Sequence, residues 1–205
     1  MKRRMIRYAI VACAVAGGLG VNAASAQTSG RFEVGVQVPI AHIDELDSTD
    51  VGIGARAAWH LLPLIGIEGE INFYPSDIPD QTAVTGNRVE GLFGITAGPR
   101  INRWRPFARI RPGFLNVGSS PEPVLCTLIF PPTLSCNLAA GGTFFTLDIG
   151  GGVEFATTSK TFVRFDIGDR MVKYPGPAID REGESHDDDF FGQDVRLAIG
   201  GGWRF

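Results

Sequence analysis

The fold is decided by residues 53–73, which read IGARAAWHLLPLIGIEGEINF. Apolar side chains occupy alternate positions on both sides of the dipeptide Pro63-Leu64, and the positions between them carry mainly Gly, Arg, His, Glu or Asn. A repeat of two is typical of a β-strand with two unlike faces, whereas a helix would repeat every 3.6 residues. The stretch therefore predicts two antiparallel strands joined by a two-residue turn.

The same alternation continues along the chain, in eight segments altogether. Each segment is long enough for a tilted strand that crosses the hydrocarbon of a membrane, which takes about 9–11 residues. After the N-terminal region, no stretch approaches the run of about 18 apolar residues that a membrane-crossing helix needs. We predict strands over 30–42, 51–62, 65–75, 87–101, 106–118, 142–156, 161–174 and 190–205.

The connections between these segments alternate in length. Three are tight turns, at Pro63-Leu64, Asn102 to Arg105, and Thr157 to Lys160. Four longer, polar or Pro-rich connections cover 43–50, 76–86, 119–141 and 175–189. Outer-membrane barrels show this arrangement, with the short turns in the periplasm. We therefore predict an all-β fold: a single eight-stranded antiparallel up-and-down transmembrane β-barrel with short periplasmic turns and longer extracellular loops.

The first 26 residues have the three parts of a secretory signal peptide. Basic residues come first, an apolar run extends from Tyr8 to Val21, and Ala24-Ser25-Ala26 provides a small-residue cleavage site. A lipoprotein acceptor at Cys13 is the alternative, but only two uncharged residues, Tyr8 and Ala9, would precede its motif Ile10-Val11-Ala12-Cys13 as a hydrophobic region. The predicted domains are a signal peptide over 1–26 and a barrel over 27–205.

The remaining chain is acidic. After residue 26 it keeps 15 Lys or Arg and 22 Asp or Glu, which gives a net formal charge of −7 and argues against nucleic acid as a partner. Two cysteines also remain, Cys126 and Cys136, in the Pro-rich connection 119–141. In an oxidising compartment such a pair predicts a disulfide across the loop.

The residues on the two faces of the strands indicate which face points to the lumen and which points outward. One face, with residues such as Phe32, Ile67, Leu147 and Leu197, is almost free of charge, and the other holds nine Arg and eight Asp or Glu among many glycines. Glycine weakens strands that face water but makes room for long side chains inside a narrow barrel. Arg rather than Lys suits paired charges in a dry interior. We predict a lumenal ion-pair network that plugs the barrel, formed by Arg31, Glu33, Arg56, Glu68, Glu70, Glu90, Arg100, Arg109, Arg111, Asp148, Glu154, Arg164, Asp166, Arg170, Asp194, Arg196 and Arg204.

Two segments fit this pattern less well. The alternation that places Val163, Phe165 and Ile167 on the apolar face also places Asp169 there, which requires a β-bulge near Gly168 or a position near the outer interface. Pro112 and Asn116 fall on the apolar face of the fifth strand. The alternative is a soluble, lipocalin-like periplasmic binding barrel, in which the apolar face would point inward and the charged face would point to water.

The aromatic residues mark one rim of the predicted barrel. Trp59, Trp104 and Trp203 all fall at the periplasmic rim, where girdles of interfacial aromatics are expected. The last eleven residues, VRLAIGGGWRF, end on Phe205 with apolar residues at alternate positions before it. This ending resembles the C-terminal assembly signal of outer-membrane proteins, in which Trp203 and Phe205 take part.

With its signal peptide and eight segments, the chain resembles the small outer-membrane barrel family typified by the OmpA transmembrane domain and OmpX-like proteins. The resemblance covers residues 31–205 and is architectural, the Phe205 pattern being its most specific part. It implies an integral protein of the bacterial outer membrane, surrounded by lipid and lipopolysaccharide. It also implies the barrel-assembly machinery and periplasmic chaperones as partners during biogenesis, and we expect a monomer.

Catalytic and metal-binding readings are weak. Some eight-stranded barrels modify lipid A, and His42 beside Asp44 with Ser48 could form a triad, but no His-x-Ser motif like that of lipid A deacylases is present. His60 is expected in the lumen as a hydrogen-bonding residue. An acidic loop could bind divalent cations, although it lacks the spacing of a calcium loop: Asp180, Glu182, Glu184, Asp187, Asp188 and Asp189.

We therefore predict no catalytic residue, no cofactor and no dedicated metal site. The expected function is that of a non-enzymatic barrel with a structural or surface-interaction role through its extracellular loops, above all the connection 119–141. The alternatives are a lipid A-modifying enzyme and the soluble barrel already described.

Overall fold

The computed structural model describes residues 31–44, 48–75, 86–119, 130–180 and 183–205. Eight long strands form one closed wall. They are β1 (Phe32–Ile43), β3 (Ile53–His60), β4 (Ile65–Tyr74), β5 (Arg88–Ala97), β6 (Trp104–Val117), β7 (Gly142–Ala156), β8 (Thr161–Tyr174) and β11 (Phe190–Arg204). The short elements at one end are β2 (Ser48–Val51), α2 (Leu134–Ala139), β9 (Ala178–Ile179) and β10 (Ser185–His186).

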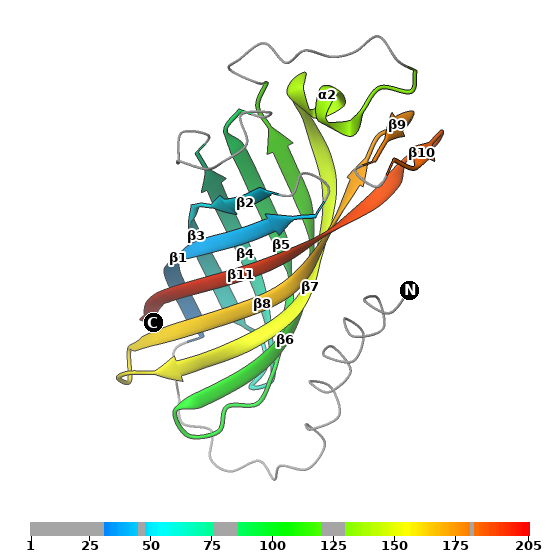
Figure 1. Cartoon of the computed structure of the whole chain (residues 1–205). Helices are drawn as coiled ribbons and strands as arrows, with labels where there is room; N and C mark the ends of the chain where they lie inside the picture. Colours follow the sequence, from blue (N-terminus) through cyan, green and yellow to red (C-terminus); the bar gives the residue numbers. More distant parts are fainter. Residues whose placement is uncertain (1–30, 45–47, 76–85, 120–129, 181–182) are drawn as a thin grey trace.

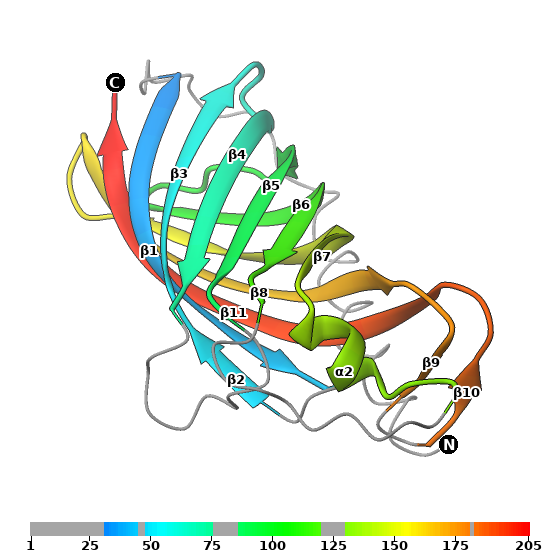
Figure 2. The ribbon, with the colours of Figure 1, turned by 90° about the horizontal axis from the view of Figure 1, so that it is seen from above.

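Each long strand pairs antiparallel with the next one along the chain, and the last strand closes the wall on the first. The closing register of β1 and β11 extends from Glu33↔Arg204 to Ile43↔Asp194. β2 continues β3 beyond Gly52 and pairs with the outer end of β1. Figure 2, seen from above, shows the strands wrapped into one curved wall. The predicted eight-stranded up-and-down barrel is confirmed.

The three tight turns lie together at one end. Leu62 and Ile65 exchange backbone hydrogen bonds of 3.0 and 3.2 Å across the predicted Pro63-Leu64 turn. The second turn closes between Ile101 and Trp104, with Asn102 in the left-handed conformation (φ 55°) that Asn tolerates better than most residues. By the rule for outer-membrane barrels, this end faces the periplasm.

β8 runs without a bulge. Its register with β11 is continuous from Trp203↔Thr161 to Phe190↔Tyr174, so the bulge near Gly168, the first of the two explanations considered for Asp169, is absent. Asp169 stays on the outer face, between Ile149 and Val195 of the neighbouring strands. The other residues that fit poorly, Pro112 and Asn116, also lie on the outside, where the Asn116 amide donates to the Thr143 hydroxyl at 2.7 Å.

The long-loop end carries an apolar lid that the sequence did not predict. Leu134 and Leu138 of α2 are buried against inward-facing side chains of the strand ends, namely Leu115, Val117, Phe144, Val172 and Tyr174. A parallel bridge between Thr133 and Ile179 joins this segment to the β9–β10 hairpin (Figure 1). In the part of the chain that the structure describes, no helix is long and apolar enough to cross a membrane.

Candidate functional site: an ionic lumen inside an apolar wall

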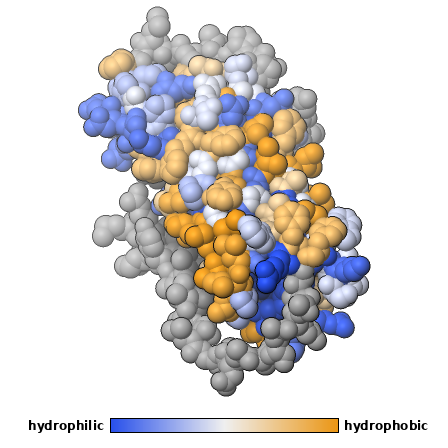
Figure 3. All heavy atoms as spheres, turned by 180° about the vertical axis from the view of Figure 1, so that it is seen from behind, coloured by the Kyte–Doolittle hydropathy of each residue, from blue (hydrophilic) through white to orange (hydrophobic). Residues whose placement is uncertain are grey.

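The outside of the wall is apolar. Ile53 is 67% exposed and Phe93 is 61% exposed. Other large apolar side chains around the barrel are exposed as well. Figure 3 shows hydrophobic residues gathered over the middle of one face, with hydrophilic residues toward both ends. A soluble protein would not leave so much contiguous apolar surface in water. The soluble, lipocalin-like alternative is therefore wrong.

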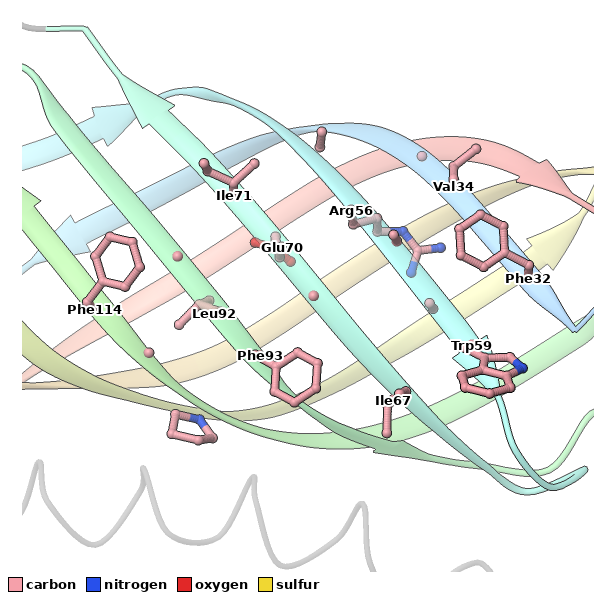
Figure 4. Close-up of a pocket in the computed structure, with 18 residues that line it drawn as sticks. Phe32, Val34, Arg56, Trp59, Ile67, Glu70, Ile71, Leu92, Phe93 and Phe114 are labelled. Carbon is pink, nitrogen blue, oxygen red and sulfur yellow. The ribbon is translucent and has the colours of Figure 1, made fainter.

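One stretch of this outer surface is hollowed into an open apolar groove of about 870 Å³. Figure 4 looks onto it: Trp59 of β3 and Ile71 of β4 stand on the outside, whereas Arg56 and Glu70 of the same two strands point into the barrel. The groove forms because small residues such as Ala57 and Gly69 face outward there, between larger side chains. A single strand thus presents lipid-compatible side chains on one side and charges on the other.

The middle of the lumen is a balanced ionic layer. Arg111 has no exposed surface, and its guanidinium donates to Glu68 at 2.7 Å, to Glu70 at 2.6 Å and to Asp148 at 2.8 Å. Burying such charges is tolerable only when each one is paired. Among the described residues the layer contains four cations and four anions: Arg109, Arg111, Arg164 and Arg196 with Glu68, Glu70, Asp148 and Asp166.

Several of these pairs cross the whole width of the barrel. β8 and β4 are four strands apart in a ring of eight, so they lie on opposite walls. Arg164 of β8 nevertheless donates twice to Glu68 of β4, at 2.6 and 3.0 Å. Arg56 of β3 and Glu154 of β7, also four strands apart, approach to 3.5 Å. The charged side chains therefore occupy the centre of the lumen.

A second ionic layer lies toward the lid. Arg170 donates to Asp194 at 2.7 Å and to Glu90 at 3.0 Å. The other oxygen of Glu90 accepts from Asn72 at 2.8 Å and from Tyr74 at 3.2 Å. Nearby, Arg88 reaches Asp50 of β2 at 2.5 Å. This layer ties β2 to the barrel wall.

The third ionic layer lies at the periplasmic end. Glu33 accepts from Arg204 at 2.7 Å and lies 3.1 Å from His60 and 3.4 Å from Arg100. Glu154 is the other carboxylate, and Arg204 bonds to it as well. Glycine allows an aromatic ring into this layer: a Cβ on Gly202 would lie 2.6 Å from Phe162, and the guanidiniums of Arg56 and Arg204 lie 4.9 and 4.8 Å from the centre of that ring.

Sixteen of the seventeen predicted lumenal residues take part in these layers, and Arg31 does not. It lies exposed at the periplasmic rim, just before β1, and makes no ion pair with the described residues. Three charged residues were missed: Asp50, Arg88 and Arg105. Arg88 lies on the same strand face as Glu90, so the alternation indicates its lumenal position, whereas Asp50 and Arg105 fall in segments that the sequence predicts to be a loop and a turn.

The triad considered as an alternative, His42 with Asp44 and Ser48, does not assemble. Ser48 is buried on the inner face of β2 opposite Ile43, whereas His42 is on the outer face, beside Asp44 at 3.6 Å and Thr49 at 3.1 Å. His60 lies in the lumen as expected.

The acidic loop keeps part of its predicted cluster. Asp180 and His186 are 2.9 Å apart, with Glu184 close to both, whereas Asp189 pairs with Lys173 at 2.8 Å. Exposed carboxylates of this kind are common without a metal ion, and we assign none here. Glu182 and Cys126, the predicted partner of Cys136 in α2, lie outside the described residues.

The aromatic residues of the periplasmic rim face outward. Trp59, Trp104 and Trp203 are each about half exposed and adjoin the tight turns, although Trp104 opens β6 rather than lying within the turn. The terminal Phe205 joins β1 through reciprocal backbone contacts with Phe32, at 2.9 and 3.3 Å. The last residue thus completes the closure of the wall.

A closed eight-stranded wall that is apolar outside and ionic inside is a membrane-spanning β-barrel, because only lipid can cover such an exterior. Residues 11–205 match the family model for the outer membrane protein beta-barrel domain. The chain belongs to this family, whose members are integral to the bacterial outer membrane.

Solved structures show the same fold at low sequence identity. The chain is similar to Neisserial surface protein A (NspA), with 14% identity and a TM-score of 0.52 over 87% of this chain and 100% of that one. It is also similar to the N-terminal β-barrel domain of Pseudomonas aeruginosa OprF, with 11% identity and a TM-score of 0.50 over 86% and 99%. A search of curated protein sequences found no match.

Proposed function

We propose that this protein is a non-enzymatic outer-membrane barrel whose lumen is plugged and whose role is structural or surface-interacting through its extracellular loops. The plugged lumen is supported above all by the Arg164–Glu68 pair, in which Nη1 of Arg164 lies 2.6 Å from Oε2 of Glu68 on the opposite side of the barrel. An eight-stranded barrel leaves an interior only about wide enough for side chains. Because salt-bridged side chains of the described residues meet at the centre, we expect the lumen to hold no continuous water path for a solute.

The extracellular end supports a surface role. The lid formed by α2 rests on an apolar cluster and is joined to the β9–β10 hairpin, which gives the longer loops a folded platform. We propose that a Cys126–Cys136 disulfide ties the lid segment, as its oxidising location favours. The surroundings are outer-membrane lipid and lipopolysaccharide, the signal peptide is removed after Ala26, and the folded protein is a monomer.

The plug is tested by conductance across a planar lipid bilayer. We expect no stepwise conductance from the wild-type protein at neutral pH. The double variant Arg164→Gly with Glu68→Gly removes the bridge without leaving one buried charge unpaired, and we expect it to show small channel openings.

Lys160→Gly, in an exposed periplasmic turn, serves as the matched control and should behave as the wild type. A steady open channel in the wild-type protein, with the same conductance in the double variant, contradicts the plug.

A further inference from the structure

The periplasmic ionic layer has more cations than anions. Its two carboxylates, Glu33 and Glu154, are surrounded by four guanidiniums within the described residues, those of Arg56, Arg100, Arg105 and Arg204. Arg56 also forms an ion pair with Glu68 of the middle layer at 2.9 Å, but Glu68 is already paired with Arg111 and Arg164. The periplasmic mouth of the lumen therefore carries an excess of positive charge that the side chains around it do not neutralise.

Arg105 is the clearest case. Its side chain lies in the lumen and the residue is only 4% exposed, yet no described carboxylate lies within 4.0 Å of it. Its Nη1 contacts Nε2 of His60 at 3.2 Å, an imidazole nitrogen that also lies 3.1 Å from Glu33, and its Nη2 has no hydrogen-bond partner. A buried guanidinium without a counter-charge is costly. The arrangement therefore favours the approach of an anion.

Arg100 places a second cation where the lumen meets the periplasm. It lies in the turn between β5 and β6, and its side chain is 27% exposed. Its contacts to Glu33 and Glu154 are long, at 3.4 and 3.9 Å. Burial, together with the nearby guanidiniums of Arg204 and Arg105, lowers the pKa of Arg100, which is the effect expected of crowded cations. An anion could replace these long contacts without disturbing a tight pair.

We propose that the periplasmic mouth binds a phosphate group between Arg100 and Arg105. The tetrahedral oxyanion has the charge to offset the excess of guanidiniums, and its oxygens match the forked N–H groups of Arg. The group can come from a free phosphate compound in the periplasm or from the headgroup of an anionic phospholipid at the inner leaflet. The chemistry that recognises both is the same.

The test measures binding of inorganic phosphate to the refolded full-length mature protein in a phospholipid-free zwitterionic detergent, by titration calorimetry at constant ionic strength with chloride as the balancing anion. We expect saturable binding by the wild type and an affinity that is at least about tenfold lower in Arg105→Gln, as the loss of a charge-assisted hydrogen bond predicts. Arg103→Gln removes the same charge from an exposed position in the adjacent turn and should bind as the wild type.

Heat-modifiable migration on gels verifies that each variant is folded. If Arg105→Gln does not fold, Arg100→Gln replaces it, because Arg100 is partly exposed and makes only long contacts. Nanodiscs of phosphatidylcholine with or without phosphatidylglycerol separate the two sources. If phosphatidylglycerol weakens the binding of inorganic phosphate, the site takes a lipid headgroup. If phosphatidylglycerol does not change that binding, the site takes a free phosphate compound. Wild-type protein that does not bind phosphate, or Arg105→Gln and Arg103→Gln that bind it equally, overturns the proposal.

Discussion

Replacing Arg111 by alanine should destabilise the folded barrel by about 3–5 kcal/mol, the usual cost of removing one partner from a buried ion pair. Arg111 is completely buried and donates to Glu68, Glu70 and Asp148. Its removal leaves three carboxylates in the lumen with one cation fewer, so the folded state carries uncompensated negative charge. The measurement is reversible urea unfolding in lipid vesicles, followed by tryptophan fluorescence.

Arg103→Ala is the control, since Arg103 lies exposed in a periplasmic turn. We expect its free energy of unfolding to stay within about 0.5 kcal/mol of the wild type, as for other surface substitutions. Equal stabilities for Arg111→Ala and Arg103→Ala would mean that the lumenal network does not hold the barrel together.

The second large effect is expected on the outer face. Leu197 lies at the middle of β11, is 44% exposed, and is flanked by Ile40 and Ile167 on the neighbouring strands. Leu197→Arg places a charge in the hydrocarbon near the midplane and should cost about 2–4 kcal/mol in the same unfolding measurement.

Leu64→Arg makes the identical change in a periplasmic turn, where Leu64 is 55% exposed, and should cost no more than about 1 kcal/mol. A difference of the opposite sign, with the turn variant less stable than the strand variant, would place β11 outside the membrane.

The strands were predictable because their signal is local. Alternation such as Ile67, Glu68, Gly69, Glu70, Ile71 fixes both the element and the faces of its side chains, and Pro63-Leu64 fixes the turn beside it. Errors appeared at element ends, where alternation gives no boundary. Arg105 was assigned to a turn although β6 begins at Trp104, and Arg31 lies beyond the first residue of β1, where the wall no longer covers it.

The lid and the pairing partners were beyond the reach of sequence patterns. A helix of six residues such as α2 is not stable by itself, and it forms here because Leu134 and Leu138 pack against the strand ends. Arg164 and Glu68 are 96 positions apart and meet only because the closure of the barrel brings β8 and β4 face to face. Composition predicted a charge-balanced lumen but not which residues pair.

In this barrel the apolar side chains meet lipid while the charged ones face the lumen. Spin labels at single cysteines along 66–73 of β4 test this orientation, in a Cys126→Ala, Cys136→Ala background reconstituted in vesicles. Collision rates with oxygen, which concentrates in lipid, should be high at positions 67, 69, 71 and 73 and low at 66, 68, 70 and 72. High rates at the even-numbered positions instead would show that the charged side chains face the lipid, which contradicts this orientation.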